Sequence, residues 1–309
     1  MSGRVRWLVT GARGQLGSEL VGVLRADGDD VTAAGRTELD LTGDGADEAV
    51  RRWAGAGHAD RLVVVNTAAW TDVDGAETDP DGAAAANVEG PARLARVCAS
   101  AGARLVHVST DYVFGAAGAV RRPFDVDDPV RPAGVYGATK EAGERAVRAE
   151  LAEHHVVRTA WVYGAAGRNF VKTIAAARHR RDTLDVVDDQ VGCPTWAGEL
   201  ARGLVALGRS DAPYGTYHCA GGGQASWYEL ARAVFEEVGA DPDRVRPCDT
   251  SRFPRPAPRP AYSVLSGRAW SAAGLPSLSP WRDGLRSAFR VNRSSLDTPR
   301  MAAACAERE

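Results

Sequence analysis

Three glycines in the turn that follows the first apolar segment constrain this chain more than any other feature. In VTGARGQLGSEL, residues 9–20, Gly11, Gly14 and Gly17 lie between a short apolar run and an amphipathic run. Glycine permits a tight turn, lets the backbone approach a pyrophosphate, and lets the next helix pack on the strand. Free N–H groups at a helix start bind phosphate well. The turn therefore predicts a dinucleotide site at Gly11, Arg13, Gly14, Gln15, Leu16 and Gly17.

Apolar strands alternate with amphipathic helices over the first half of the chain. The expected strands cover residues 4–11, 30–35, 61–69, 104–114 and 154–164. The expected helices cover residues 15–28, 45–57, 80–101 and 136–151. Near-continuous apolar strands separated by helices indicate a parallel sheet that is buried on both faces. The predicted fold class is therefore α/β, with a Rossmann-type doubly wound parallel sheet.

The regular alternation loosens after residue 165, and this predicts three segments. Residues 1–165 are expected to form the dinucleotide-binding domain, with a sheet that later segments complete. Residues 166–291 are expected to form mainly a smaller α/β substrate-binding domain. Residues 292–309 have no clear period and are expected to be a flexible tail.

The end of the second strand bears on the choice of cofactor. An acid at this point would bind the ribose 2′-hydroxyl of NAD, but the segment AAGRTELDL contains Arg36 instead. Arg36, together with Arg13 of the glycine turn, can meet a 2′-phosphate and favours NADPH, with NADH as the alternative. Asp40 and Leu41 follow where they can border the adenine.

A tyrosine and a lysine lie four residues apart in VYGATKEAGE, residues 135–144. Tyr136 and Lys140 therefore project from one face of a helix, and Lys140 is one of only two lysines in the chain. A carbonyl that accepts hydride at carbon must receive a proton at oxygen, and a phenol beside an ammonium group can donate it. Thr110, at the end of a strand, can polarise the same oxygen. The residues predict a carbonyl reductase with Thr110, Tyr136 and Lys140 as its catalytic trio.

Two residues beside Thr110 admit either a functional or a structural reading. Asp111 can orient the loop or contact the substrate, and Tyr112 can stack on the substrate. For Asp111 and for Tyr112, a role in substrate binding and a purely structural role are both open.

Composition and charge exclude several other classes of protein. The formal net charge of −2 gives no field that favours nucleic acid or an anionic membrane. No run of 18 or more apolar residues, the length expected of a membrane span, occurs in the sequence. The five cysteines are scattered, which argues for a reducing, cytoplasmic location and against a structural zinc site. No metal ligands are therefore assigned.

Several segments together resemble the dTDP-4-dehydrorhamnose reductase family, which are extended short-chain dehydrogenases/reductases. The G-x-x-G-x-x-G spacing is typical of the short-chain enzymes. The likeness extends over roughly residues 4–290, and its most specific parts are VVDDQVGCPT and APRPAYSVL. The other matching segments are TGARGQLGSEL, NTAAWTDVDGAE, STDYVFG, VYGATKEAGE, RTAWVYG and NFVKTI. The resemblance implies reduction of the C4 keto group of a dTDP-4-keto-6-deoxy-L-hexose, giving dTDP-L-rhamnose from dTDP-4-dehydrorhamnose.

The resemblance also implies roles for residues outside the trio. Asn66, Ala68 and Ala69 match a loop along the cofactor's ribose and nicotinamide. The residues that match substrate-facing positions are Trp161, Asn169, Phe170, Gln190 and Arg259. Some family members bind Mg²⁺ between two subunits through glutamates. Glu19 and Glu199 lie in the corresponding segments, although helix-surface carboxylates are the favoured reading.

Two departures from the family pattern leave the sugar open. Gly75 stands where the family usually has lysine, and Gly115 and Ala116 stand where it usually has an acidic residue and glycine. One alternative is therefore a 4-ketoreductase for another dTDP-deoxysugar, such as a dihydrostreptose-type sugar of an antibiotic pathway. Another is a non-catalytic regulatory subunit that binds dinucleotide. The expected assembly is a monomer or a homodimer.

Overall fold

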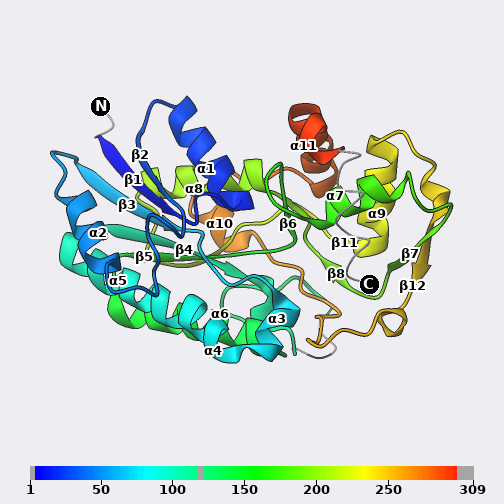
Figure 1. Ribbon diagram of the computed structural model, residues 1–309, viewed down its shortest axis with the longest axis horizontal. Coiled ribbons are helices and arrows are strands. Elements are labelled where there is room, and N and C mark those ends of the chain that lie inside the picture. Colours follow the sequence, from blue (N-terminus) through cyan, green and yellow to red (C-terminus); the bar gives the residue numbers. More distant parts are fainter. Residues whose placement is uncertain (1–3, 117, 119–120, 298–309) are drawn as a thin grey trace.

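A six-stranded parallel sheet forms the centre of the larger lobe. The computed structural model describes residues 4–116, 118 and 121–297 (Figure 1). The strands lie in the order β10-β5-β4-β3-β1-β2. Their bounds are β1 Val5–Thr10, β2 Asp30–Ala34, β3 Arg61–Asn66, β4 Arg104–Thr110, β5 His154–Thr159 and β10 Gly215–His218. The order reverses at β1, which pairs with β2 on one side and β3 on the other, so a ligand crevice is expected at the carboxyl ends of β1 and β3.

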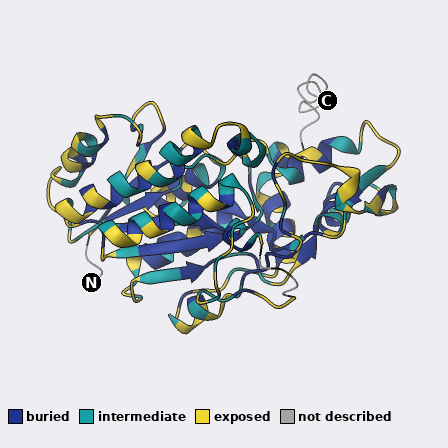
Figure 2. Cartoon of the chain, turned by 90° about the horizontal axis from the view of Figure 1, so that it is seen from below, coloured by how far each residue is buried: buried dark blue, intermediate teal, exposed yellow. Residues whose placement is uncertain are grey.

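Alternate residues of these strands pack against helices on opposite faces of the sheet. Trp7 and Val9 of β1 belong to one apolar core, which includes Leu20 and Leu204 from α1 (Gln15–Ala26) and α8 (Ala197–Arg209). Leu8 belongs to a second core on the other face, formed with α2 (Ala46–Ala54), α5 (Gly90–Ala101) and α6 (Val135–Glu150). Figure 2 shows the buried strands between the helices. The predicted α/β class with a doubly wound parallel sheet is confirmed.

The expected helix over residues 80–101 is helical throughout but not uniform. It consists of α4 (Pro80–Ala84), a π-helical turn η1 (Ala85–Glu89) and α5. A π-turn inside a helix is rare and frequently occurs at a functional site. Before it lies α3 (Val73–Thr78), and after β4 a 3₁₀ turn, η2, covers Asp111–Phe114.

The smaller lobe has its own apolar core. Buried side chains of α7 (Phe170–Ala177), α9 (Trp227–Glu237) and α11 (Trp281–Leu296) pack together there. Its strands are short and pair as β12-β7, β11-β8 and β6-β9. The bounds are β6 Val162–Tyr163, β7 Leu184–Val187, β8 Val191–Gly192, β9 Thr195–Trp196, β11 Ala225–Ser226 and β12 Val245–Cys248, with η3 Pro242–Arg244 and η4 Thr250–Arg252. Helix α10 (Arg268–Ala272) belongs to the larger lobe, where Trp270 joins the core of α1 and α8.

The chain crosses between the lobes more than once. After β9, the segment that contains α8 and β10 returns to the larger lobe, where β10 extends the sheet beside β5 (Figure 1). Residue 292, the predicted start of the tail, coincides with a kink in α11, and the helix continues beyond it to the buried Leu296, after which Asp297 pairs with Arg178 at 2.7 Å. Residues 298–309 lie outside the described residues.

Within the described part of the chain, no helix has the length and apolar character needed to cross a membrane.

Candidate active site

A cavity of about 650 Å³ opens at the carboxyl ends of the central strands. It is lined by most of the residues predicted for the cofactor and by the whole predicted catalytic trio. The predicted residues that line it are Gly11, Arg13, Gly14, Gln15, Leu16, Gly17, Arg36, Asp40, Leu41, Ala68, Ala69, Thr110, Asp111, Tyr112, Tyr136, Lys140 and Trp161. Segments that are far apart in the sequence therefore meet in one cavity.

The glycine turn forms a cradle that side chains would fill. Gly11 has a φ of +65°, and a Cβ placed there would lie 2.7 Å from the Ala68 backbone nitrogen. A Cβ on Gly17 would lie 2.3 Å from the Gly11 carbonyl oxygen. Gly14 is the N-cap of α1 and provides no side-chain cap for the first N–H groups of the helix. These residues fit a dinucleotide pyrophosphate, which would accept hydrogen bonds from those groups.

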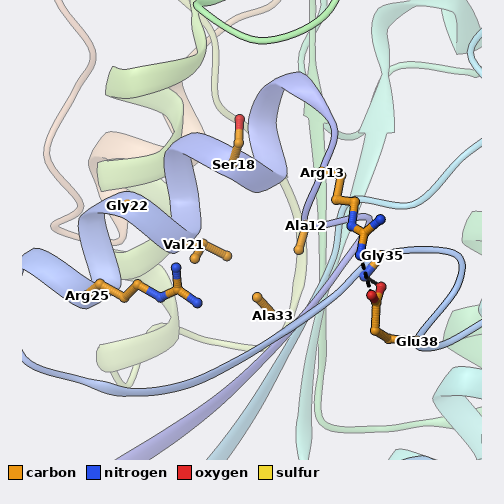
Figure 3. A pocket seen from close by; sticks show the side chains of 9 residues that line it. All are labelled: Ala12, Arg13, Ser18, Val21, Gly22, Arg25, Ala33, Gly35 and Glu38. Atoms are coloured by element: carbon orange, nitrogen blue, oxygen red, sulfur yellow. Dashed lines mark hydrogen bonds and ion pairs between the residues drawn. The ribbon is translucent and has the colours of Figure 1, made fainter.

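Both arginines predicted to meet a 2′-phosphate are paired with acids. Arg13 forms an ion pair with Glu38, which Figure 3 shows between the glycine turn and the segment after β2. Arg36 Nε lies 3.4 Å from Asp40 Oδ2. Hydrogen bonds from Thr42 and the charge of Arg36 lower the pKa of Asp40. Glu38 is an acid that the sequence analysis did not select.

Asn66 does not line the cavity but supports the loop that does. Its buried side-chain oxygen accepts hydrogen bonds from Thr10 Oγ1 at 2.6 Å and from the Ala68 backbone at 3.1 Å. Its amide nitrogen lies 3.0 Å from His107 Nδ1. In this structure Asn66 supports the loop from below, while Thr67, Ala68 and Ala69 face the cavity, and its predicted contact with the cofactor stays a prediction.

The π-turn places a second asparagine against the same loop. Asn87, which is fully buried, accepts a hydrogen bond from the Trp70 backbone at 2.9 Å. Its amide nitrogen donates to the Trp70 carbonyl and to Thr139 Oγ1, each at 3.2 Å. Asn87 thus connects the loop after β3 to α6, the helix of Tyr136 and Lys140. The Ala-rich sequence around Asn87 gave no signal for this turn.

Lys140 is held beneath the cavity by the neighbouring strand. Its Nζ donates a hydrogen bond to the Val108 carbonyl oxygen at 2.8 Å. Burial lowers the pKa of Lys140 to about 8, against the opposing charge of Glu144. The ammonium form is therefore retained at neutral pH and is lost at moderately alkaline pH.

The phenol of Tyr136 differs from the expectation in one respect. Burial raises the pKa of Tyr136 to about 12, with the hydrogen bond to Thr110 acting in the opposite direction. The lowered pKa expected for Tyr136 beside Lys140 is therefore not found in this structure, because burial and the charge of Asp111 both raise the pKa. Tyr112 packs edge-on against Tyr136, with ring centroids 5.3 Å apart.

Asp111 is a buried carboxyl group directly beside Thr110. It accepts hydrogen bonds from Thr110 Oγ1 at 3.2 Å and Ser263 Oγ at 2.5 Å. Burial raises the pKa of Asp111 to about 6. Its bond to Ser263 anchors the turn after β4 to the segment that follows the APRP motif.

A buried ion pair fixes α6 to the sheet one turn beyond Lys140. Glu144 accepts hydrogen bonds from Arg158 Nη2 at 2.7 Å and Ser109 Oγ at 2.6 Å. Burial alone would raise the pKa of Glu144, but Arg158 and Ser109 hold it at about 2. The helix that carries Tyr136 is thereby held in register with β4, which carries Thr110.

The wall of the cavity on the side of the smaller lobe is a pair of stacked indoles. Trp161 and Trp227 are nearly parallel, with centroids 3.5 Å apart, and both line the cavity. Trp161 has a φ of +47°, which is unusual for a bulky residue. Trp227 also donates from Nε1 to Gln190 Oε1 at 3.1 Å and packs against Phe170. Trp227 was not selected from the sequence, although its position directly after the helix cap Ser226 is readable there.

Four residues predicted to face the substrate do not line the cavity. Asn169 caps α7 and donates to Gln15 Oε1 at 3.1 Å. Phe170 and Gln190 lie behind Trp227, and Gln190 donates to Thr250 Oγ1 at 2.9 Å. Arg259 is paired with Asp74 of α3 at 2.8 Å. The structure therefore brings Trp161 to the trio, and places the other four in the surrounding contacts.

One of the two glutamates considered for Mg²⁺ is held by a neighbouring serine. Glu199 accepts hydrogen bonds from the backbone and the hydroxyl of Ser279, at 3.1 and 2.8 Å. Across residues 4–116, 118 and 121–297, no group of three or more His, Cys, Asp or Glu side chains is placed to hold a metal ion.

The chain is similar to known proteins over most of its length. Residues 5–293 match the family model described as RmlD substrate binding domain. A dTDP-4-dehydrorhamnose reductase of Streptomyces griseus is 50% identical over 291 residues, which cover 93% of this chain and 93% of that protein. A probable dTDP-4,6-dihydroxy-2-methyloxan-3-one 4-ketoreductase of Streptomyces antibioticus is 47% identical, covering 92% and 95%. The structure of dTDP-4-dehydrorhamnose reductase from Bacillus anthracis in complex with NADP has a TM-score of 0.85 and 33% identity, covering 94% and 100%.

Proposed function

The chain belongs to the RmlD substrate binding domain family, and from that premise we propose that it reduces a dTDP-4-keto-6-deoxy-L-hexose at C4. The enzyme is an NAD(P)H-dependent oxidoreductase. The favoured reaction converts dTDP-4-dehydrorhamnose to dTDP-L-rhamnose. The proposed location is the cytoplasm, and the proposed assembly is a monomer or a homodimer. The observation that carries the proposal is that the glycine cradle and the trio Thr110, Tyr136 and Lys140 line one cavity.

Tyr136 is the proposed proton donor. The bound dihydronicotinamide supplies hydride to the carbonyl carbon. Because the pKa of Tyr136 is raised to about 12, the phenol carries its proton at neutral pH and is ready to protonate the alkoxide oxygen. An aliphatic alkoxide is a stronger base than a phenolate, so this transfer is favourable. Thr110, hydrogen bonded to the same phenol, orients the donor and can polarise the carbonyl oxygen.

Lys140 is proposed to hold the cofactor ribose and to stabilise the phenolate that remains. Its hydrogen bond to the Val108 carbonyl fixes the ammonium group beneath the cavity. An ammonium group near a phenol favours the ionised form of the phenol once its proton has left. The two effects act at different moments: burial keeps Tyr136 protonated before hydride transfer, and the cation lowers the cost of its ionisation afterwards.

NADPH is the proposed cofactor of choice, with NADH accepted less well. Arg13 and Arg36 both line the cavity near the end of β2, where they can bind a 2′-phosphate. The structure of the Bacillus anthracis relative in complex with NADP supports this choice. On the substrate side, Trp161 and Trp227 are proposed to pack on the deoxysugar, and residues 166–291 to hold most of the nucleotide.

A second candidate keeps the chemistry and changes the sugar. The relative from Streptomyces antibioticus is named as a 4-ketoreductase of a different dTDP sugar at 47% identity. Gly75, a departure from the family pattern, lies in α3 beside Asp74, the partner of Arg259. This candidate predicts faster turnover of another dTDP-4-keto sugar than of dTDP-4-dehydrorhamnose.

Consumption of NADPH with a dTDP-4-keto-6-deoxy-L-hexose tests the proposal. The purified chain should oxidise NADPH only when the sugar nucleotide is present, and NMR should identify the C4 alcohol as product. A non-catalytic regulatory subunit would bind NADPH without oxidising it under the same conditions. That result would replace the reductase by the binding-protein alternative.

A further inference from the structure

An ion pair between Arg13 and Glu38, which we call the rim pair, lies beside the glycine turn, where Arg13 lines the main cavity. Figure 3 shows Arg13 reaching from the turn before α1 to meet Glu38 from the segment after β2. Glu38 Oε2 also accepts a hydrogen bond from the Gly35 backbone at 2.9 Å. Arg13 and Gly35 line both the main cavity and a second hollow of about 290 Å³, whereas Glu38 lines the second hollow and reaches the main cavity through its contacts with these two residues.

The backbone beside the rim pair leaves room for it. A Cβ on Gly35 would lie 2.9 Å from Glu38 Oε2 and 3.0 Å from the Cδ of Arg13. A larger residue at position 35 would therefore have to push the two side chains apart. Glu38 is thus held by a backbone hydrogen bond as well as by the guanidinium group of Arg13.

The other cation expected at this end of the cavity also has an acidic partner. Arg36 pairs with Asp40, whose Oδ1 is held by the Thr42 backbone at 3.0 Å and the Thr42 hydroxyl at 2.7 Å. A hydrogen bond from Thr37 and the charge of Arg13 lower the pKa of Glu38, so its carboxylate is ionised at neutral pH. A dianionic phosphate that approaches either arginine therefore meets a carboxylate beside it.

We propose that Glu38 is a specificity-determining residue for the nucleotide, which favours an unphosphorylated adenosine ribose over one that carries a 2′-phosphate. Its carboxylate can accept a hydrogen bond from a ribose 2′-hydroxyl, as acids at the end of the second strand do in NAD-binding folds. The same carboxylate repels a 2′-phosphate and competes with it for Arg13. Glu38 therefore weakens the preference for NADPH that Arg13 and Arg36 create. The inference rests on the proposed function, since it concerns the same nucleotide site.

The effect is expected to be moderate and dependent on salt. The side chains of Arg13 and Glu38 are 71% and 44% exposed, so water and ions screen their charges. Charge complementarity at such a rim changes the choice between ligands more than the total affinity. A sensitive test therefore compares two ligands that differ only in the 2′ substituent.

The test measures binding of adenosine 2′,5′-bisphosphate and of adenosine 5′-monophosphate by calorimetry, with Glu38→Gln in the full chain. Glutamine keeps the size of the side chain and an oxygen for the Gly35 N–H, and removes the charge. The 2′-phosphorylated probe should bind about fivefold more tightly to the variant, while the other probe should bind equally or more weakly. At about 1 M salt, where the Debye length is about 3 Å, the gain should largely disappear.

A charge-matched variant and a double variant complete the design. Glu48→Gln removes one negative charge from α2, where Glu48 pairs with Arg52 at 3.1 Å, and should change neither affinity. Adding Arg13→Gln to Glu38→Gln should return the 2′-phosphorylated probe to the affinity of the original chain or below. Equal changes for both probes, or no change for either, would overturn the role of Glu38. If the unmodified chain bound neither probe nor NADPH, the proposed function itself would fail.

Discussion

Lys140 Nζ donates a hydrogen bond to the Val108 carbonyl oxygen at 2.8 Å, which ties the ammonium group to the strand that ends at Thr110. Tyr136 lies one helical turn before Lys140, and Glu144 lies one turn after it. Glu144 is bound to Ser109 on the same strand. Helix α6 is therefore attached to β4 at two successive turns, and the phenol of Tyr136 is held beside Thr110 before any ligand binds.

The first prediction concerns the dependence of activity on pH. Burial lowers the pKa of Lys140 to about 8, so the ammonium form is present below that pH and is lost as the pH rises through it. The value of kcat/KM for NADPH should therefore fall above about pH 8, with the pH dependence expected of a single group that loses its proton. Lys140→Met should have a low kcat/KM at every pH and should not show this fall at alkaline pH. The other lysine offers a control, because Lys172→Met should keep the fall in kcat/KM above about pH 8. If Lys172→Met abolished that fall, Lys140 would not be the group that causes it.

The second prediction concerns the proton donor. Tyr136→Phe removes the hydroxyl group and keeps the ring that packs against Tyr112. Turnover should fall by about 10²–10⁴-fold, the usual contribution of a general acid. The dissociation constant for NADPH, followed by nucleotide fluorescence, should change by less than about threefold, because Lys140 and the glycine cradle remain. An unchanged kcat would exclude Tyr136 as the acid.

The third prediction concerns the indole wall. Trp227→Ala should raise the KM for the sugar nucleotide by about tenfold and lower kcat less, because the side chain contributes binding surface and no proton. Trp227→Phe should recover most of the affinity, since an aromatic ring can still stack on Trp161. Steady-state kinetics with the dTDP-keto sugar distinguish the outcomes. A loss confined to kcat, with KM unchanged, would contradict a role in binding the substrate.

The fourth prediction compares two glycines at the start of the chain. Gly11→Ala should destabilise the protein by about 2 kcal/mol or more, because a positive φ and a close backbone neighbour both oppose a Cβ. Gly22→Ala, within α1 and with no atom within 4 Å of the added carbon, should stabilise it by about 0.5–1 kcal/mol. Urea unfolding of both variants measures the difference. Equal effects would mean that the glycine turn is not a constrained cradle.

The sequence predicts the sheet and most of the cavity because these depend on local patterns. Apolar strands and the spacing of Gly11, Gly14 and Gly17 determine where the cradle lies, and the i, i+4 spacing puts Tyr136 and Lys140 on one face. Glu38 and Asn87 could not be selected in this way. Glu38 reaches Arg13 only because the chain turns back after β2, and Asn87 faces Trp70 only because a π-turn shifts the helix register.

The pKa of Tyr136 shows a second limit of sequence reasoning. A neighbouring lysine predicts a lowered value, yet the pKa is raised to about 12 because the surrounding side chains exclude water from the phenol. Burial depends on the whole fold and cannot be read from the spacing of two residues. In the same way, the buried Leu296 ties residues beyond 292 to the smaller lobe, although their sequence has no clear period.

The destination of the hydride tests the central claim most directly. NADPH would be labelled with deuterium at the nicotinamide position from which hydride is transferred. It would be incubated with the chain and dTDP-4-dehydrorhamnose, and the product would be examined by NMR. We expect deuterium bonded to C4 of the hexose. The proton on the C4 oxygen should come from the medium and carry no label. Oxidation of the labelled cofactor without deuterium at C4, or no oxidation of the cofactor at all, would contradict it.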